Sequence, residues 1–144
     1  MTEKHALLIG NSEYEDDNIP DLTKPRRNIA DFEKVLIDPQ ICEFNPDHVK
    51  SLGDHPKTSV EKAVARFFSE KNRNDFLLLY FTGHGFRDQR GELYLAVQDT
   101  EKDLLGASAV SAAFITREIG NCRAKNQVII LDCCFSGAFK ASGD

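Results

Sequence analysis

The sequence contains no long hydrophobic run and no secretion signal. None of its apolar stretches reaches the roughly 20 residues that a membrane-spanning helix requires. The first residues of the 144-residue chain, Met1 to His5, lead directly into a strand-like run and do not have the layout of a signal peptide. We therefore predict a cytoplasmic protein with no membrane partner.

Positive charge is scattered along the chain rather than gathered in a block. There are 18 Lys and Arg residues against 23 Asp and Glu residues, which gives a formal net charge of −5. Nucleic acids and anionic membranes bind to concentrated positive charge. Nucleic acid is therefore not expected as a partner.

The cysteine and glycine patterns argue against two further classes. The chain has four Cys residues, of which Cys133 and Cys134 are adjacent. Without a secretory signal, free thiols in a reducing compartment are expected rather than disulfides. No G-x-G-x-x-G pattern and no Walker lysine follows the first apolar run, Ala6 to Gly10. A ligand-binding α/β domain of the flavodoxin type therefore has little support.

Apolar runs alternate with amphipathic segments along the chain. Strands are expected at residues 5–10, 48–52, 76–84, 92–97 and 128–132, and helices at 25–37, 58–68 and 111–120. Pro25 suits the first turn of a helix, and Thr58-Ser-Val-Glu61 has the pattern of a capping box. Ser111 or Thr116 is the expected cap of the last helix. This order predicts one α/β domain over residues 1–144, with a mostly parallel sheet and helices on both faces.

Two of the apolar runs lead into reactive side chains. Val128 to Leu131 is predicted to be a strand buried on both faces, and Asp132-Cys133-Cys134 follows it. Phe76 to Phe81 is followed by Thr82-Gly83-His84-Gly85. Reactive residues of open α/β sheets lie just beyond the carboxyl ends of the strands. A thiol and an imidazole at neighbouring strand ends can form a nucleophile–base pair.

Two other roles are open to these residues. A free cysteine often behaves as a small buried hydrophobe. A zinc site would need about four ligands, and His84, Cys133 and Cys134 supply three at most. We therefore predict no metal here. The other histidines have no thiol or carboxylate in useful register and are expected at the surface: His5, His48 and His55.

The segments Thr82-Gly-His-Gly85 and Asp132-Cys-Cys-Phe-Ser-Gly137 together resemble the caspase-like cysteine peptidases. The resemblance is closest to metacaspases and their bacterial relatives, the orthocaspases. Ala6 to Asn11 and Asn28-Ile-Ala-Asp31 occur in the family order, so the resemblance covers the whole chain. It implies a caspase-like three-layer sandwich.

The resemblance also implies roles for individual residues. Cys134 matches the nucleophile, and His84 matches the general base and acid. The backbone N–H groups of Gly85 and Cys134 match the oxyanion hole, which stabilises negative charge on the tetrahedral intermediate. Cys133 matches a variable position and is expected in packing or in the pocket wall. No third acid can be assigned from the sequence.

Substrate preference follows from two acids. Animal caspases cut after aspartate with the help of basic pocket residues, and the matching positions here carry Asp31 and Asp132. Two carboxylates at the floor of a pocket attract a guanidinium or ammonium group. We therefore predict cleavage after Arg or Lys. In the alternative interpretation Asp31 only solvates a helix face and Asp132 holds a turn.

Caspase-like domains continue into a small subunit whose strands help to shape the substrate pocket. The resemblance therefore implies that this chain is the large subunit, with the small-subunit strands missing. Lys140 is then a candidate self-processing site, because it suits an enzyme that cleaves after basic residues.

No cofactor is expected. Some metacaspases are activated by calcium, and the chain has one acidic loop that contains Glu13, Glu15, Asp16 and Asp17. A calcium site needs several converging oxygens, and most such acidic runs are simply solvated.

The leading hypothesis is a cysteine endopeptidase, made as a zymogen and used for limited proteolysis of protein or peptide substrates. Cell death and bacterial defence are the settings that the resemblance suggests, with an activator protein as a further partner. The alternative is a catalytically silent regulatory or interaction module that keeps the caspase fold, because fold alone does not establish function.

Overall fold

The computed structural model of the protein describes residues 2–134, and for Cys134 its backbone alone. The strands are Lys4–Gly10 (β1), Val49–Gly53 (β2), Phe76–Arg87 (β3), Leu93–Leu95 (β4), Val110–Ser111 (β5) and Asn126–Cys134 (β6). The helices are Pro25–Ile37 (α1), Lys57–Phe68 (α2), Leu105–Ser108 (α3) and Ala112–Asn121 (α4), with short 3-10 turns at Pro46–His48 and Lys102–Leu104.

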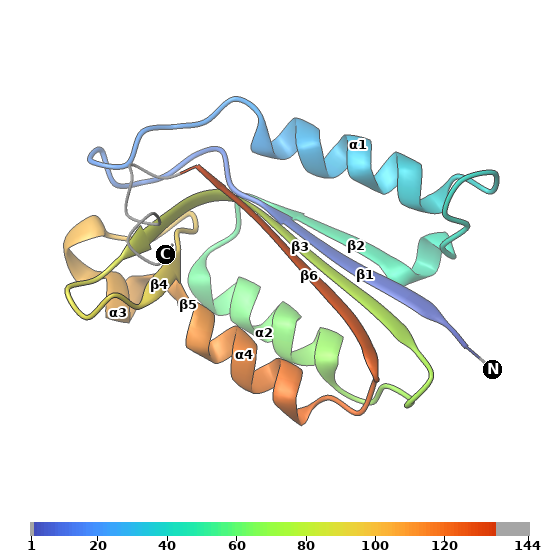
Figure 1. Ribbon diagram of the computed structural model, residues 1–144. Helices are drawn as coiled ribbons and strands as arrows, with labels where there is room; N and C mark the ends of the chain where they lie inside the picture. Colours follow the sequence, from blue (N-terminus) through green and yellow to red (C-terminus); the bar gives the residue numbers. More distant parts are fainter. Residues whose placement is uncertain (1, 135–144) are drawn as a thin grey trace.

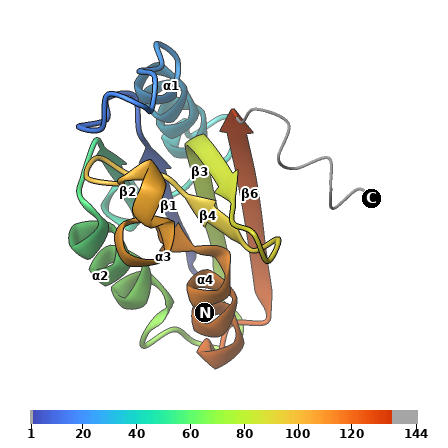
Figure 2. The same ribbon diagram turned by 90° about the vertical axis from the view of Figure 1, so that its left-hand side faces the viewer.

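Four strands form a parallel sheet in the order β2-β1-β3-β6. The far end of β3 continues beyond this sheet and pairs antiparallel with β4, which in turn pairs antiparallel with β5. Figure 2 shows β6 beside β3 at the outer edge of the sheet. The prediction of a mostly parallel sheet is therefore confirmed.

Helices cover both faces of the sheet. Figure 1 shows α1 on one face and α2 with α4 on the other. Alternate residues of the central strands serve the two layers, since successive side chains of a strand point to opposite faces. Leu8 and Leu78 pack in the α1 layer, whereas Leu7 and Leu79 pack in the α2 and α4 layer. The expected caspase-like three-layer sandwich is confirmed.

Local sequence explains where α1 and α4 begin. α1 starts at Pro25, as predicted, and α4 starts after Ser111, whose Oγ accepts the Phe114 N–H at 3.0 Å. The capping box predicted for α2 is wrong. α2 starts at Lys57, and the Lys57 N–H donates to Asp99 Oδ1 at 2.8 Å, so a distant acid replaces the local cap.

The prediction that the last apolar run is buried on both faces is also wrong. Val128 is 40% exposed and Ile130 is 39% exposed. Within the described residues β6 pairs on one side alone, with β3, and α1 packs over β1, β2 and β3. One face of β6 therefore remains open. No helix between residues 2 and 134 combines the length and apolarity needed to cross a membrane.

Candidate active site

The parallel pairing of β3 with β6 brings the two predicted reactive residues together. The last pairs of this ladder are Gly83 with Cys133 and His84 with Cys134. Neighbouring strands lie about 4.8 Å apart. The predicted strands at 76–84 and 128–132 are too short, because β3 runs on to Arg87 and β6 spans Asn126–Cys134, which includes both cysteines.

Cys133 packs toward the interior. Its side chain lies against the apolar cluster of the α2 and α4 layer. A Cβ atom added to Gly85 would lie 3.3 Å from the Cys133 Sγ, so the glycine leaves the room that this thiol occupies. This placement agrees with the packing role predicted for Cys133.

The His84 imidazole is held by a backbone carbonyl. Its side chain is buried, and Nε2 lies 2.8 Å from the carbonyl oxygen of Pro20. A carbonyl can only accept, so this hydrogen bond requires the proton on Nε2. The lone pair of the neutral ring then lies on Nδ1. The Pro20 carbonyl thus takes the orienting position for which the sequence offered no acid.

Tyr14 contacts the same histidine through its hydroxyl and its ring. Its hydroxyl donates to the carbonyl of Asn11 at 2.9 Å and accepts the backbone N–H of His84 at 3.1 Å. The Tyr14 and His84 ring centroids are 5.2 Å apart, and the Phe86 ring stacks on His84 at 5.8 Å. Gly83 makes this approach possible, since a Cβ there would lie 3.0 Å from the Tyr14 hydroxyl.

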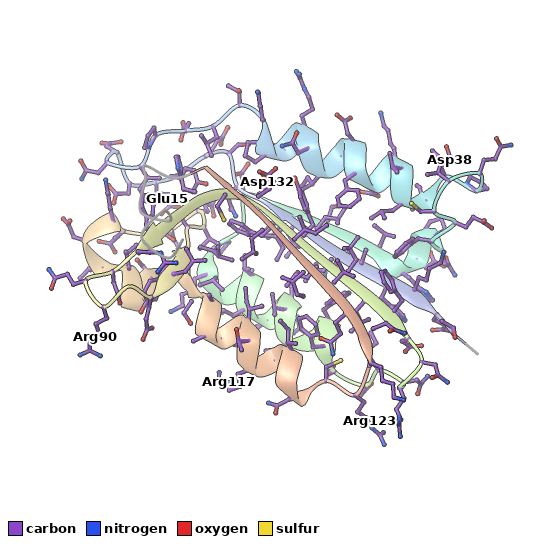
Figure 3. The ribbon with its side chains drawn as sticks, viewed as in Figure 1. Glu15, Asp38, Arg90, Arg117, Arg123 and Asp132 are labelled. Atoms are coloured by element: carbon purple, nitrogen blue, oxygen red, sulfur yellow. The ribbon has the colours of Figure 1, made fainter. Side chains whose placement is uncertain are left out.

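Asp132 lies in β6, directly before the two cysteines, and is exposed. The Tyr80 hydroxyl donates to Asp132 Oδ2 at 3.1 Å. Burial raises the pKa of Tyr80, and the negative charge of Asp132 adds to the effect. Figure 3 shows Asp132 near the end of β6, on the side of α1. The alternative that Asp132 holds a turn is wrong, because the residue belongs to a strand.

Asp31 lies exposed on α1. Among the described residues no hydrogen bond joins it to Asp132, so its place in a shared pocket stays a prediction. The next residue, Phe32, contacts the Tyr80 ring edge-on with centroids 5.0 Å apart. Tyr80 thus connects the α1 segment that carries Asp31 with the end of β6.

The acidic loop lies at the rim of an open pocket of about 750 Å³, to which Glu15, Asp16 and Asp17 contribute. Asp16 accepts the N–H of Lys102 at 2.7 Å and that of Asn18 at 2.9 Å. These backbone hydrogen bonds lower the pKa of Asp16. At least this member of the loop has a structural task.

Some of the predicted features lie outside the described residues. These are the Phe135-Ser136-Gly137 part of the cysteine motif, the candidate processing residue Lys140 and the side chain of Cys134. The oxyanion-hole assignment to the N–H groups of Gly85 and Cys134 stays a prediction. Cys42, Cys122 and Cys133 are free cysteines.

The sheet covered by helices on both faces has the architecture of a caspase-like fold. The family model described as the caspase domain matches residues 3–144. The chain therefore belongs to the caspase domain family. A comparison with curated proteins returned no significant match. Family membership supports a cysteine-protease-like function, with proteins as the substrates.

Proposed function

We propose that the chain is a cysteine endopeptidase in which Cys134 is the nucleophile and His84 is the general base and acid. The observation that carries this proposal is the hydrogen bond from His84 Nε2 to Pro20, in a residue that pairs with Cys134 across the sheet. The metacaspase-like subtype belongs to the same proposal.

The reaction begins with proton transfer from the Cys134 thiol to Nδ1 of His84. The thiolate attacks the scissile carbonyl carbon, and the N–H groups of Gly85 and Cys134 stabilise the resulting oxyanion. The Pro20 carbonyl stabilises the imidazolium, because it already accepts the Nε2 proton. The imidazolium then protonates the leaving amine, the C–N bond breaks and an acyl-enzyme remains.

Hydrolysis of the acyl-enzyme uses the same residues, with water as the nucleophile. Nδ1 of His84 takes a proton from water, and the hydroxide attacks the thioester carbonyl. Collapse of the second tetrahedral intermediate breaks the C–S bond, and the proton on Nδ1 returns to the Cys134 sulfur. The enzyme is restored without any metal or cofactor.

Cleavage after Arg or Lys is the second part of the proposal. The Tyr80 hydroxyl holds one oxygen of Asp132 in place. The exposed carboxylate can then pair with a guanidinium group, and such charge-assisted pairs discriminate strongly. Asp31 on α1 contributes a second negative charge on the same side of the sheet.

A partner strand beside β6 is the third part. Within the described residues β6 pairs with β3 alone, and unpaired strand edges are sites where further strands add. The open face of β6 carries the exposed side chains of Val128 and Ile130. A small subunit that follows in the same precursor would cover this face and complete the pocket. Self-processing near Lys140 and control by an activator protein fit a zymogen of this kind, used in limited proteolysis during cell death or bacterial defence.

The test is hydrolysis of fluorogenic peptides that end in Arg, Lys, Asp or Leu, with this chain and with any longer natural form that contains it. We expect cleavage after Arg and Lys that is lost in Cys134→Ala and kept in the matched control Cys133→Ala. Asp132→Asn should reduce the preference for Arg over Leu. Preference for Asp would overturn the specificity, and hydrolysis that survives Cys134→Ala would overturn the nucleophile. No hydrolysis by any form would favour the catalytically silent module.

A further inference from the structure

A second cluster of titratable side chains lies at the opposite ends of the strands. His5 is on β1, His48 closes the 3-10 turn before β2, and Glu3 directly precedes β1. The parallel register pairs Ala6 with Val49, so the two histidines are neighbours. The expectation that no carboxylate lies in register with them is wrong.

The three side chains converge. The rings of His5 and His48 stack with centroids 4.3 Å apart and an interplanar angle of 25°. His5 Nε2 lies 3.4 Å from a carboxylate oxygen of Glu3. One ligand atom from each of the three residues lies within 4.8 Å of the other two.

We propose that Glu3, His5 and His48 bind a zinc ion. Two imidazoles and one carboxylate suit zinc among the common divalent metals, and three protein ligands leave one position for water. Ligand atoms around tetrahedral zinc at about 2.0 to 2.1 Å are roughly 3.4 Å apart. The widest separation in the cluster therefore has to close by about 1.4 Å, which rotation of the rings about their soft χ2 torsions provides.

The two histidines of the cluster are partly shielded from solvent, and the side chain of His5 is 16% exposed. Charges of both signs surround His5, from Lys71 on the one hand and from Asp75 and Glu3 on the other.

A small pocket beside the cluster gives a metal ion room to enter. It has a volume of about 230 Å³ and is lined in part by Glu3, Glu43 and His48. Lys4 also lines it, but its ammonium group donates to the Cys42 carbonyl and lies over the Phe44 ring. The positive charge of Lys4 is thus already engaged.

The site is separate from the proposed active site and does not depend on the peptidase activity. His5 pairs with Leu77 on β3, seven residues before His84. At about 3.3 Å per residue the two sites are roughly 23 Å apart. Bound zinc would tie the start of β1 to the turn before β2 and stabilise the folded chain, because the unfolded chain lacks the cluster.

The experiment is calorimetric titration with Zn²⁺, together with the visible spectrum of the Co²⁺ complex. Both are made in a Cys134→Ala background, which removes the thiol as a competing ligand. We expect one metal ion per chain and the absorption of four-coordinate Co²⁺. The melting temperature should rise by about 9 °C at a Zn²⁺ concentration 100-fold above Kd.

Three variants locate the site. His5→Asn, His48→Gln and Glu3→Gln should each weaken binding at least about tenfold. His55→Gln is the matched control and should bind as before. Glu3→Gln keeps the test valid if a histidine variant fails to fold, because half of the Glu3 side chain is exposed. Binding that none of the three variants weakens, or no binding up to about 1 mM Zn²⁺, would overturn the proposal.

Discussion

The two halves of β3 are equally buried, but different parts of the structure cover them. In Phe76 to Phe81 the apolar side chains pack against helices on both faces of the sheet. In Thr82 to Arg87 the neighbours are the end of β6, the strand β4 and the loop that carries Tyr14. The backbone of His84 donates its N–H to the Tyr14 hydroxyl and accepts the N–H of Ala96. Burial alone therefore does not separate a structural segment from a functional one.

The difference assigns separate tasks to the two halves. The first half contributes apolar burial, which is non-directional and stabilises the fold. The second half fixes directions, because hydrogen bonds determine the tautomer of His84 and the position of its ring. Changes in the first half should reduce stability and leave the chemistry intact, and changes in the second half should do the reverse.

The largest expected effect is on activity, in the second half. His84→Asn removes the base that takes the Cys134 proton, and general acid–base catalysis contributes about 10² to 10⁴-fold. We expect kcat/KM to fall by that factor, while the free energy of unfolding changes by about 1 kcal/mol through the lost hydrogen bond to Pro20. Peptide hydrolysis and urea denaturation measure the two quantities. Full activity of a folded His84→Asn protein would contradict the assignment of the chemistry to the second half of β3.

The next effect is on stability, in the first half. Leu79 is fully buried between β3 and the α2 and α4 layer. Leu79→Ala should reduce the free energy of unfolding by about 2 to 5 kcal/mol, because it leaves a cavity. The control is Ile41→Ala, at a side chain that is 58% exposed. Activity per folded molecule should not change, and a loss of activity without a loss of stability would be inconsistent with the assignment.

A smaller effect is expected at Tyr14, which is hydrogen-bonded to the second half of β3. Tyr14→Phe keeps the ring beside His84 and removes the hydroxyl that bridges His84 and Asn11. We expect kcat to fall about tenfold with KM unchanged, and a cost of about 1 to 3 kcal/mol for the unpaired backbone groups. A purely structural role would show the stability cost with an unchanged kcat. Tyr94→Phe on β4 is the matched control.

The smallest effect is expected at Asp16, in the acidic loop. Backbone N–H groups of Lys102 and Asn18 lower the pKa of its carboxyl. The folded state therefore favours the carboxylate, and this stabilisation is present above the ordinary pKa of 3.8 and lost as the pH falls through the lowered value. In Asp16→Asn, the midpoint of urea unfolding should fall less steeply as the pH is lowered than it does in the unchanged protein. An identical decline in both proteins would exclude this contribution.

Much of the fold could be predicted from periodicity and end signals. Pro25 and Ser111 mark helix starts through local chemistry, and the apolar runs of β1 and β3 mark central strands. The short β5 and α3 were not predicted, because two to four residues carry no periodic pattern. The cap of α2 was assigned wrongly, because Asp99 reaches it from a distant loop.

The site was partly predictable for a similar reason. Candidate site residues such as His84 and Cys133 can be identified in the sequence, and the family resemblance implies a role for each. The Pro20 carbonyl has no sequence signal, because every residue has a carbonyl and the fold alone decides which one meets His84. The clustering of Glu3 with His5 and His48 also depends on strand register, which single residues do not reveal.

The most direct test of the central claim is the rate at which a peptidyl-arginine chloromethyl ketone alkylates each cysteine, located by mass spectrometry. The account predicts that Cys134 reacts much faster than Cys133 and that His84→Asn abolishes the difference. Preferential alkylation of Cys133, or of Cys134 at a rate that does not depend on His84, would contradict it.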